Sequence, residues 1–186
     1  METGSVAVAL QANSIGIPYE MIFFDTNGKT LEELAAVFGK CRYVLSSVEE
    51  IDALNSAAKD LVLPGRLETI AIRVVPEEES ASENALGIPE ARIPELSAVL
   101  RKAEHIAVKG VFVRPASSKN VSAEMVKRYF SLVKDFRSYL PCTLSYFCFE
   151  SLLKSLPGIE GKALSDCLGM IRSLNDTSLY AQFLIS

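Results

Sequence analysis

The stretch Ile70-Ala71-Ile72-Arg73-Val74-Val75 is apolar except for one arginine. A run so rich in β-branched residues is typical of a strand that is buried on both faces of a parallel sheet. Comparable runs precede and follow it at regular intervals. We expect six strands, at Met21–Phe24, Tyr43–Ser46, Thr69–Val75, Ile106–Val113, Leu144–Phe149 and Ala181–Ile185.

Amphipathic helical patterns lie between these strands, with apolar residues three and four positions apart. The longest pattern runs from Val126 to Leu140, and the opening stretch up to about Gln11 also indicates a helix. Thr30–Glu33 and Ser47–Glu50 have the hydroxyl-to-carboxylate spacing of capping boxes, which mark helix starts. Strict alternation of strand and helix predicts an α/β fold with a parallel sheet and helices outside. We expect residues 1–186 to form a single domain.

Composition excludes several functional classes. The chain has 186 residues, 49% of them hydrophobic, which argues against disorder. A net charge of −4 argues against a nucleic-acid partner, which would require a basic face. No apolar run reaches the roughly 18 residues that span a bilayer, so we expect no membrane partner and a cytoplasmic protein. The four cysteines are interpreted as buried thiols and form no metal-binding pattern.

In parallel α/β folds, ligands bind at the carboxyl ends of the strands. Arg73 lies near such an end and needs an acceptor, because an arginine cannot lose its charge on burial. Two interpretations stay open, a structural pair with Asp25 or Glu150 and an anion site. Arg114 ends another strand and is either a solvated loop arginine or a phosphate contact. Lys29 follows a turn signal, and we expect it to be exposed.

These segments, in this order, resemble the barrel domain of the ornithine/diaminopimelate/arginine decarboxylase family. Its members are pyridoxal-phosphate enzymes with an alanine racemase-like N-terminal domain. The resemblance covers most of the chain and implies a partial (β/α) TIM-type barrel with about six parallel strands. It also implies that the family's first two βα units and its C-terminal β domain are absent. Ile15–Phe24 is similar to the family's G-v-p-p-e-r-I-i-f, Asn27–Thr30 to gp-x-K-t, Tyr43–Ile51 to i-x-v-D-S-x-x-E-L, Ile70–Pro76 to v-x-l-R-i-n-P, Leu86–Ile88 to K-F-G-i, and Val108–Ser117 to v-x-G-l-h-F-H-i-G-S.

The departures from the family pattern concern catalysis. The family's Schiff-base lysine would precede Met1, and its E-P-G-R motif would follow Ser186. Its cofactor-stacking histidine falls at Arg114, and its glycine-rich phosphate loop falls at residues 146–150, Tyr-Phe-Cys-Phe-Glu. Side chains at that loop would block the close backbone approach that a phosphate requires. The resemblance therefore leaves Arg73, Ser117 and Arg114 as cofactor-contact positions and predicts no catalytic residue, no metal and no pyridoxal phosphate bound by this chain.

Three functional hypotheses follow from the residues that are kept and lost. The first is a non-catalytic protein that associates with its own copies or with a decarboxylase-like partner. The second is a fragment of an active amino-acid decarboxylase or racemase whose catalytic lysine lies outside this chain. The third is a small-molecule binder that uses the two arginines and Ser117 for an anion. Six strands would leave a barrel open, with unpaired edges at Met21–Phe24 and Ala181–Ile185 that invite self-association. The alternative is an extra strand at Val6–Leu10 that covers one edge.

Overall fold

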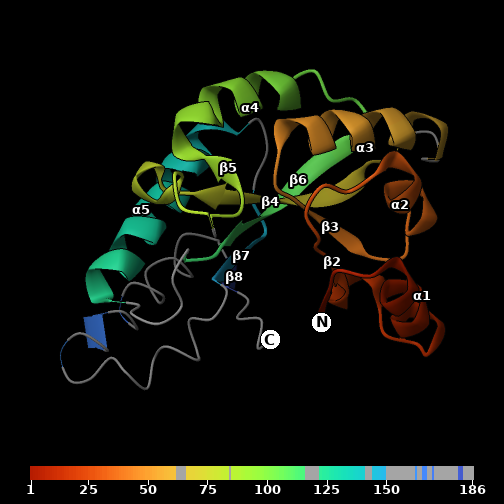
Figure 1. The fold of residues 1–186 in the computed structure, drawn as a ribbon, viewed down its shortest axis with the longest axis horizontal. Coiled ribbons are helices and arrows are strands. Elements are labelled where there is room, and N and C mark those ends of the chain that lie inside the picture. Colours follow the sequence, from red (N-terminus) through yellow and green to blue (C-terminus); the bar gives the residue numbers. More distant parts are fainter. Residues whose placement is uncertain are drawn as a thin grey trace.

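The computed structural model describes residues 1–61, 66–83, 85–115, 122–140 and 144–149, together with residues 162, 165, 166, 169, 180 and 181. Within these residues the chain forms one sheet in which every pair of neighbouring strands is parallel. The sheet curls into half of a barrel, and helices α2 (Leu31–Ala36), α3 (Val48–Leu61), α4 (Ile93–Leu100) and α5 (Ala123–Tyr139) form an arc outside the strands (Figure 1). The predicted fold class, a partial TIM-type barrel, is confirmed.

The strands follow one another across the sheet in the order β1-β2-β3-β4-β6-β7-β8, and β5 pairs with β4 outside this path. The two longest strands, β4 and β6, form the centre of the sheet, and they slip by one residue between Ile70 and Ala71. The strand bounds are β1 Glu2–Thr3, β2 Phe23–Phe24, β3 Arg42–Leu45, β4 Glu68–Val75, β5 Ile88–Pro89, β6 Ile106–Val113, β7 Tyr146–Phe149 and β8 Tyr180–Ala181. The first five predicted strand segments therefore contain a strand. Of the sixth, Ala181 lies in β8, and residues 182–185 lie outside the described residues.

Two helices, at Leu31–Ala36 and Val48–Leu61, begin at the two sites that the sequence marks. Thr30 accepts a hydrogen bond from the Glu33 N–H while the Glu33 carboxylate accepts one from the Thr30 N–H, which completes the predicted capping box. Ser122, which the sequence did not mark, caps the longest helix with a single bond in which its hydroxyl accepts from the Met125 N–H. The helix bounds are α1 Val6–Ser14, α2 Leu31–Ala36, α3 Val48–Leu61, α4 Ile93–Leu100 and α5 Ala123–Tyr139, with short 3-10 turns at Tyr19–Met21, Glu77–Glu79 and Glu90–Arg92.

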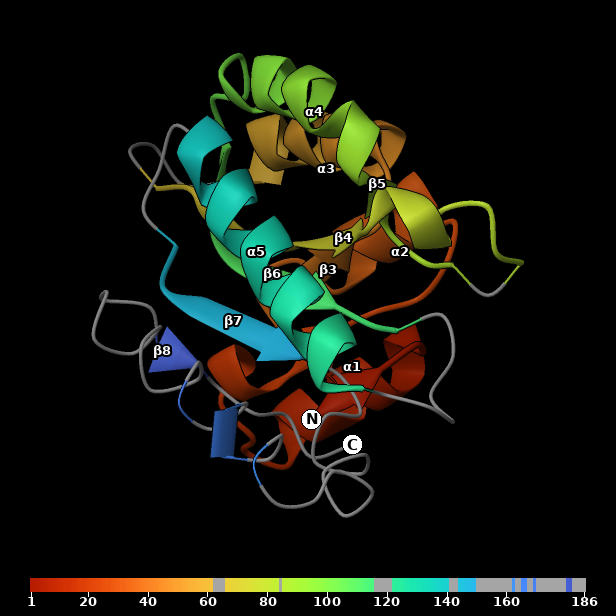
Figure 2. The ribbon, with the colours of Figure 1, turned by 90° about the vertical axis from the view of Figure 1, so that its left-hand side faces the viewer.

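The buried apolar residues form two separate clusters, one on each face of the sheet. The larger cluster joins the outward-facing strand residues to the helices. The smaller cluster contains strand residues alone, namely Phe23, Val44, Ala71, Phe112, Tyr146 and Cys148. Figure 2 shows α3, α4 and α5 gathered around one side of the strands, which leaves the other side to this smaller cluster. The strands are thus buried on both faces, as their continuous apolar runs predict.

The start of the chain confirms one prediction and contradicts another. The helix expected up to about Gln11 is α1, so the alternative in which Val6–Leu10 forms an additional strand is wrong. Glu2–Thr3 forms β1 instead and pairs with β2, so β2 is not an unpaired edge. A strand of two residues has no hydrophobic periodicity, which is why the sequence did not indicate it. Over the described part of the chain, no helix combines the length and apolar character that crossing a membrane requires.

Candidate functional site

Charged side chains gather at the carboxyl ends of the central strands, and Arg73 is one of the most deeply buried. Its side chain is 1% exposed. Its Nη1 donates to Asp25 Oδ1 at 3.1 Å, and its Nη2 donates to Asp25 Oδ2, so the contact is bidentate. Glu2 Oε1 lies 3.8 Å from the same Nη2. The predicted burial and carboxylate pairing of Arg73 are confirmed with Asp25, and Glu150 lies outside the described residues.

The loop before β5 packs directly onto Arg73. Gly87 has a φ of +130°, a conformation that L side chains rarely adopt. A Cβ at Gly87 would lie 2.9 Å from both Cγ and the carbonyl oxygen of Arg73. Glycine is therefore required at this position for two reasons, backbone conformation and close approach. Asp25 therefore contacts the guanidinium of Arg73, and the loop at Gly87 covers the aliphatic part and the backbone of the same residue.

A second buried ion pair lies beside the first. Lys29 Nζ is 3.3 Å from Glu50 Oε2 and donates to the carbonyl oxygen of Thr26 at 2.6 Å. Glu50 also accepts from the backbone N–H groups of Ser46 and Lys29, at 2.8 and 3.1 Å. Burial lowers the pKa of Lys29, and the nearby Glu50 opposes that effect. The expectation that Lys29 is exposed is wrong, because its side chain has 0% exposed surface.

Of the other two predicted positions, the structure describes Arg114 alone, and none of its described contacts joins it to this network. Arg114 follows β6 and is exposed, and its carbonyl oxygen accepts a hydrogen bond from the Tyr129 hydroxyl at 3.0 Å. Ser117 lies outside the described residues. Of the three predicted cofactor contacts, the structure therefore places Arg73 in the buried cluster and Arg114 at the surface of the same sheet edge.

Aromatic side chains fill the inner face at β6 and β7. The ring of Tyr146 packs edge-on against Phe23 and Phe112, with centroids 5.9 and 6.4 Å apart. The Arg42 guanidinium lies over the Tyr146 ring, 4.9 Å from its centroid. The ring rests on Gly110, where an added Cβ would lie 2.0 Å from it. Burial raises the pKa of Tyr146 to about 12, so its hydroxyl stays protonated at neutral pH.

These described residues do not fit pyridoxal phosphate as the resemblance would place it. The guanidinium of Arg73 is bonded to Asp25, and the amine of Lys29 is enclosed in its own ion pair. All four residues of β7 are buried, with Tyr146 and Cys148 on the inner face and Phe147 and Phe149 in the outer core. The network can hold β1, β2 and β4 in position, but its charges are already matched within the chain.

Comparison with solved structures defines the fold. The chain shares the fold of the diaminopimelate and arginine decarboxylases. Diaminopimelate decarboxylase from Helicobacter pylori, complexed with L-lysine, matches with a TM-score of 0.73 at 18% identity over 98% of this chain and 49% of that one. Arginine decarboxylase from Paramecium bursaria Chlorella virus, bound to agmatine, gives 0.71 at 14% identity over 98% and 51%. Diaminopimelate decarboxylase from M. jannaschii, with L-lysine, gives 0.72 at 15% identity over 98% and 47%.

The chain therefore spans about half the length of the solved structures that it matches. No family model matches the sequence, and no curated protein matches it either. At such low identity, the agreement with the sequence resemblance holds for the fold.

Sequence reasoning missed Glu2 and the Lys29–Glu50 pair. Glu50 occupies the position expected of a capping-box carboxylate, and the Ser47 hydroxyl does accept from the Glu50 N–H at 3.1 Å. The Glu50 carboxylate, however, bonds to Ser46 and Lys29, and only the fold brings Lys29 within reach. Among the described residues, no group of three or more histidine, cysteine or acidic side chains could hold a metal ion.

Proposed function

We propose that this chain is a non-catalytic relative of the pyridoxal-phosphate decarboxylase barrel that acts by association with a second copy of itself. The observation that carries the non-catalytic part is the closed ion-pair network at the strand ends. Among the described residues, Arg73 and Lys29 are the buried cations there, and each is held by a buried carboxylate of the chain. A phosphate or an imine would have to break these pairs, which costs several kcal/mol.

The open sheet supports association. Its order ends with β1 on one side and β8 on the other, and each has two residues. Parallel strands in barrels gain stability from a neighbour on both edges. A second copy can supply that neighbour, with both copies using the same edge around a twofold axis. A decarboxylase-like chain of the same fold is the alternative partner.

The length relation to the solved decarboxylases favours a second candidate, a part of an active amino-acid decarboxylase or racemase. In that case the lysine that reacts with pyridoxal phosphate belongs to another segment or chain. Arg73, Arg114 and Ser117 would then be the residues of this chain that contact the cofactor, and a small anion could use the same positions.

One sample tests both proposals. The purified chain is mixed with pyridoxal phosphate, reduced with borohydride and analysed by mass spectrometry. We expect no stoichiometric adduct at a single lysine, because the described lysine at the strand ends is buried and paired. Stoichiometric labelling of one lysine, with the visible absorbance of an imine, would support the second candidate instead.

Light scattering after size exclusion tests the association. We expect at micromolar concentration a mass of at least twice the 20.3 kDa of the chain. A mass of one chain at all accessible concentrations would contradict self-association. If the mass of one chain increased only after a decarboxylase-like chain was added, the result would support that chain as the partner in place of a second copy.

A further inference from the structure

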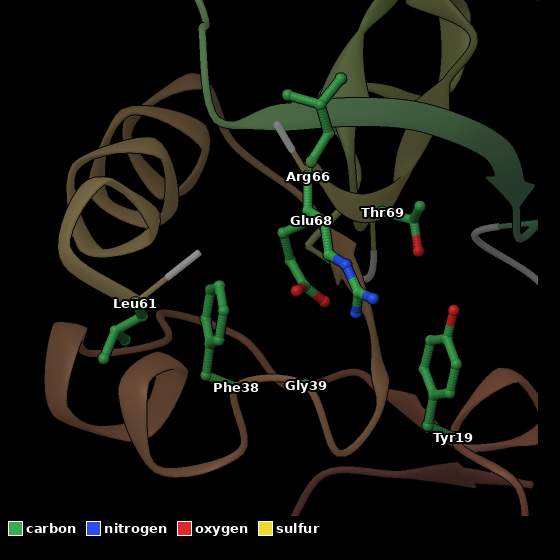
Figure 3. Close-up of a pocket in the computed structure, with 8 residues that line it drawn as sticks. Tyr19, Phe38, Gly39, Leu61, Arg66, Glu68 and Thr69 are labelled. Carbon is green, nitrogen blue, oxygen red and sulfur yellow. The ribbon is translucent and has the colours of Figure 1, made fainter. Parts of the chain in front are cut away.

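A cavity opens at the end of the sheet opposite to the ion-pair network. It lies at the start of β4, where Glu68 is the first strand residue, whereas Arg73 lies near the end of the same strand. Its volume is about 360 Å³, within the range of small-molecule sites. Figure 3 shows its lining, which comprises Tyr19, Phe38, Gly39, Leu61, Arg66, Leu67, Glu68 and Thr69.

One part of the cavity wall is polar, and the other part consists of apolar side chains that are partly exposed. Phe38 follows α2, and Leu61 ends α3 with 47% of its surface exposed. Leu67 and Tyr19 are exposed to 53% and 37%. A ligand that covers these side chains removes apolar surface from water, and this lowers the free energy of the complex.

Glu68 is a charged group of the cavity that has no partner among the described residues. Its carboxylate has no hydrogen bond or ion pair with any described residue, although its backbone N–H donates to His105. Burial raises the pKa of Glu68 to about 7. The buried carboxylates Asp25 and Glu50, in contrast, are both held by cations. A ligand cation beside Glu68 would give this carboxylate the positive partner that Asp25 and Glu50 have within the chain.

Arg66 supplies the opposite charge on the same side of the cavity. In Figure 3 its guanidinium points into the cavity near the Glu68 carboxylate. No ion pair joins Arg66 and Glu68 among the described contacts, so both charges can pair with a ligand. Two unlike charges that face one cavity without bonding to each other match a ligand that carries both charges itself.

We propose that this cavity binds a small zwitterion with an apolar side group. The ligand's ammonium group pairs with Glu68 and its anionic group pairs with Arg66. Its apolar group lies against Phe38 and Leu61. This inference is independent of the proposed function, since the cavity shares no residue with the network at the opposite strand ends.

Three matched probes test the proposal on the full chain by calorimetry at a pH above the pKa of Glu68. L-leucine carries both charges, 3-methylbutylamine lacks its carboxylate, and 4-methylpentanoate lacks its ammonium group. We expect saturable binding of L-leucine and at least about tenfold weaker binding of the other two, because each loses a charged hydrogen bond. No saturation by L-leucine up to about 10 mM, or equal binding of 4-methylpentanoate, would overturn the proposal.

Two variants locate the site. Glu68→Gln keeps the shape of the side chain and should weaken L-leucine binding at least about tenfold, and Arg66→Gln should weaken it as well. Glu104→Gln makes the same chemical change at an exposed position outside the cavity and should bind normally. The amide resonance of Gly39, which lines the cavity, should shift on binding. Unchanged binding by Glu68→Gln, or an unmoved Gly39 resonance, would place the ligand elsewhere and refute the assignment.

Discussion

Arg73 and Asp25 illustrate the energetics of single residues in this fold. Changing Arg73 to Met leaves the Asp25 carboxylate buried without its partner, so we expect a loss of about 3 to 5 kcal/mol in the free energy of unfolding. Replacing both residues by Met and Leu should recover most of that loss, because an apolar pair needs no solvation. Urea unfolding of the wild type, both single variants and the double variant measures this cycle. Equal stability of the single variants and the wild type would show that the pair contributes little.

The Arg73–Asp25 pair could be predicted because a charge within an apolar strand needs an acceptor, and Asp25 follows a neighbouring strand. The burial of Lys29 could not be predicted. Its acceptor, Glu50, is 21 positions away and sits where a helix cap is expected. Likewise, nothing in the sequence marks Glu68 as unpaired, since its isolation depends on the helices that surround it.

The carboxyl group of Glu68 predicts how stability changes with pH. Its pKa rises from 4.5 to about 7 on folding, so between these values the folded chain holds a proton that the unfolded chain releases. The contribution of Glu68 is therefore fully present below pH 4.5 and is lost as the pH rises through about 7. Glu68→Gln should remove this dependence, which we expect to amount to about 1 to 2 kcal/mol after allowance for partial exposure. Urea unfolding of the wild type and of Glu68→Gln at several pH values in this range measures the effect. The prediction is contradicted if the free energy of unfolding changes equally with pH in both proteins.

At the scale of elements, the contact between β6 and β7 depends on one glycine. A Cβ at residue 110 would lie 2.0 Å from the Tyr146 ring, so Gly110→Ala should cost about 1 to 3 kcal/mol in stability. Adding Tyr146→Ala should relieve the clash, although the lost ring then has its own cost. Gly169→Ala is the control, because a Cβ there meets nothing within 4 Å. If Gly110→Ala unfolds at the wild-type urea concentration, the two strands are not packed as described.

The long elements were predictable and the short ones were not. Strands β4 and β6 and helices α3 and α5 are long enough for their hydrophobic periodicity to be recognised in the sequence. Strands β1 and β5 have two residues each, and their backbone partners come from β2 and β4. A prediction that relies on local pattern cannot detect an element whose existence depends on a neighbour in space.

At the scale of the whole molecule, association should make stability depend on concentration. If the open sheet is completed by a second copy, dissociation accompanies unfolding, and a hundredfold increase in protein concentration adds about 2.7 kcal/mol. The melting temperature should therefore rise by several degrees across that range. Superimposable melting curves at both concentrations would indicate that each chain unfolds alone.

The order of the strands has a consequence for how the chain is made. The strands along the main path of the sheet follow the same order in space as in the sequence, and only β5 lies outside that path. A chain that leaves the ribosome from its N-terminus would therefore find the partner of each new strand already present. Closure of short segments also costs little entropy, which favours growth of the sheet one unit at a time. The fold is suited to assembly during translation, with β4 and β6 joining only after the α4 segment has emerged.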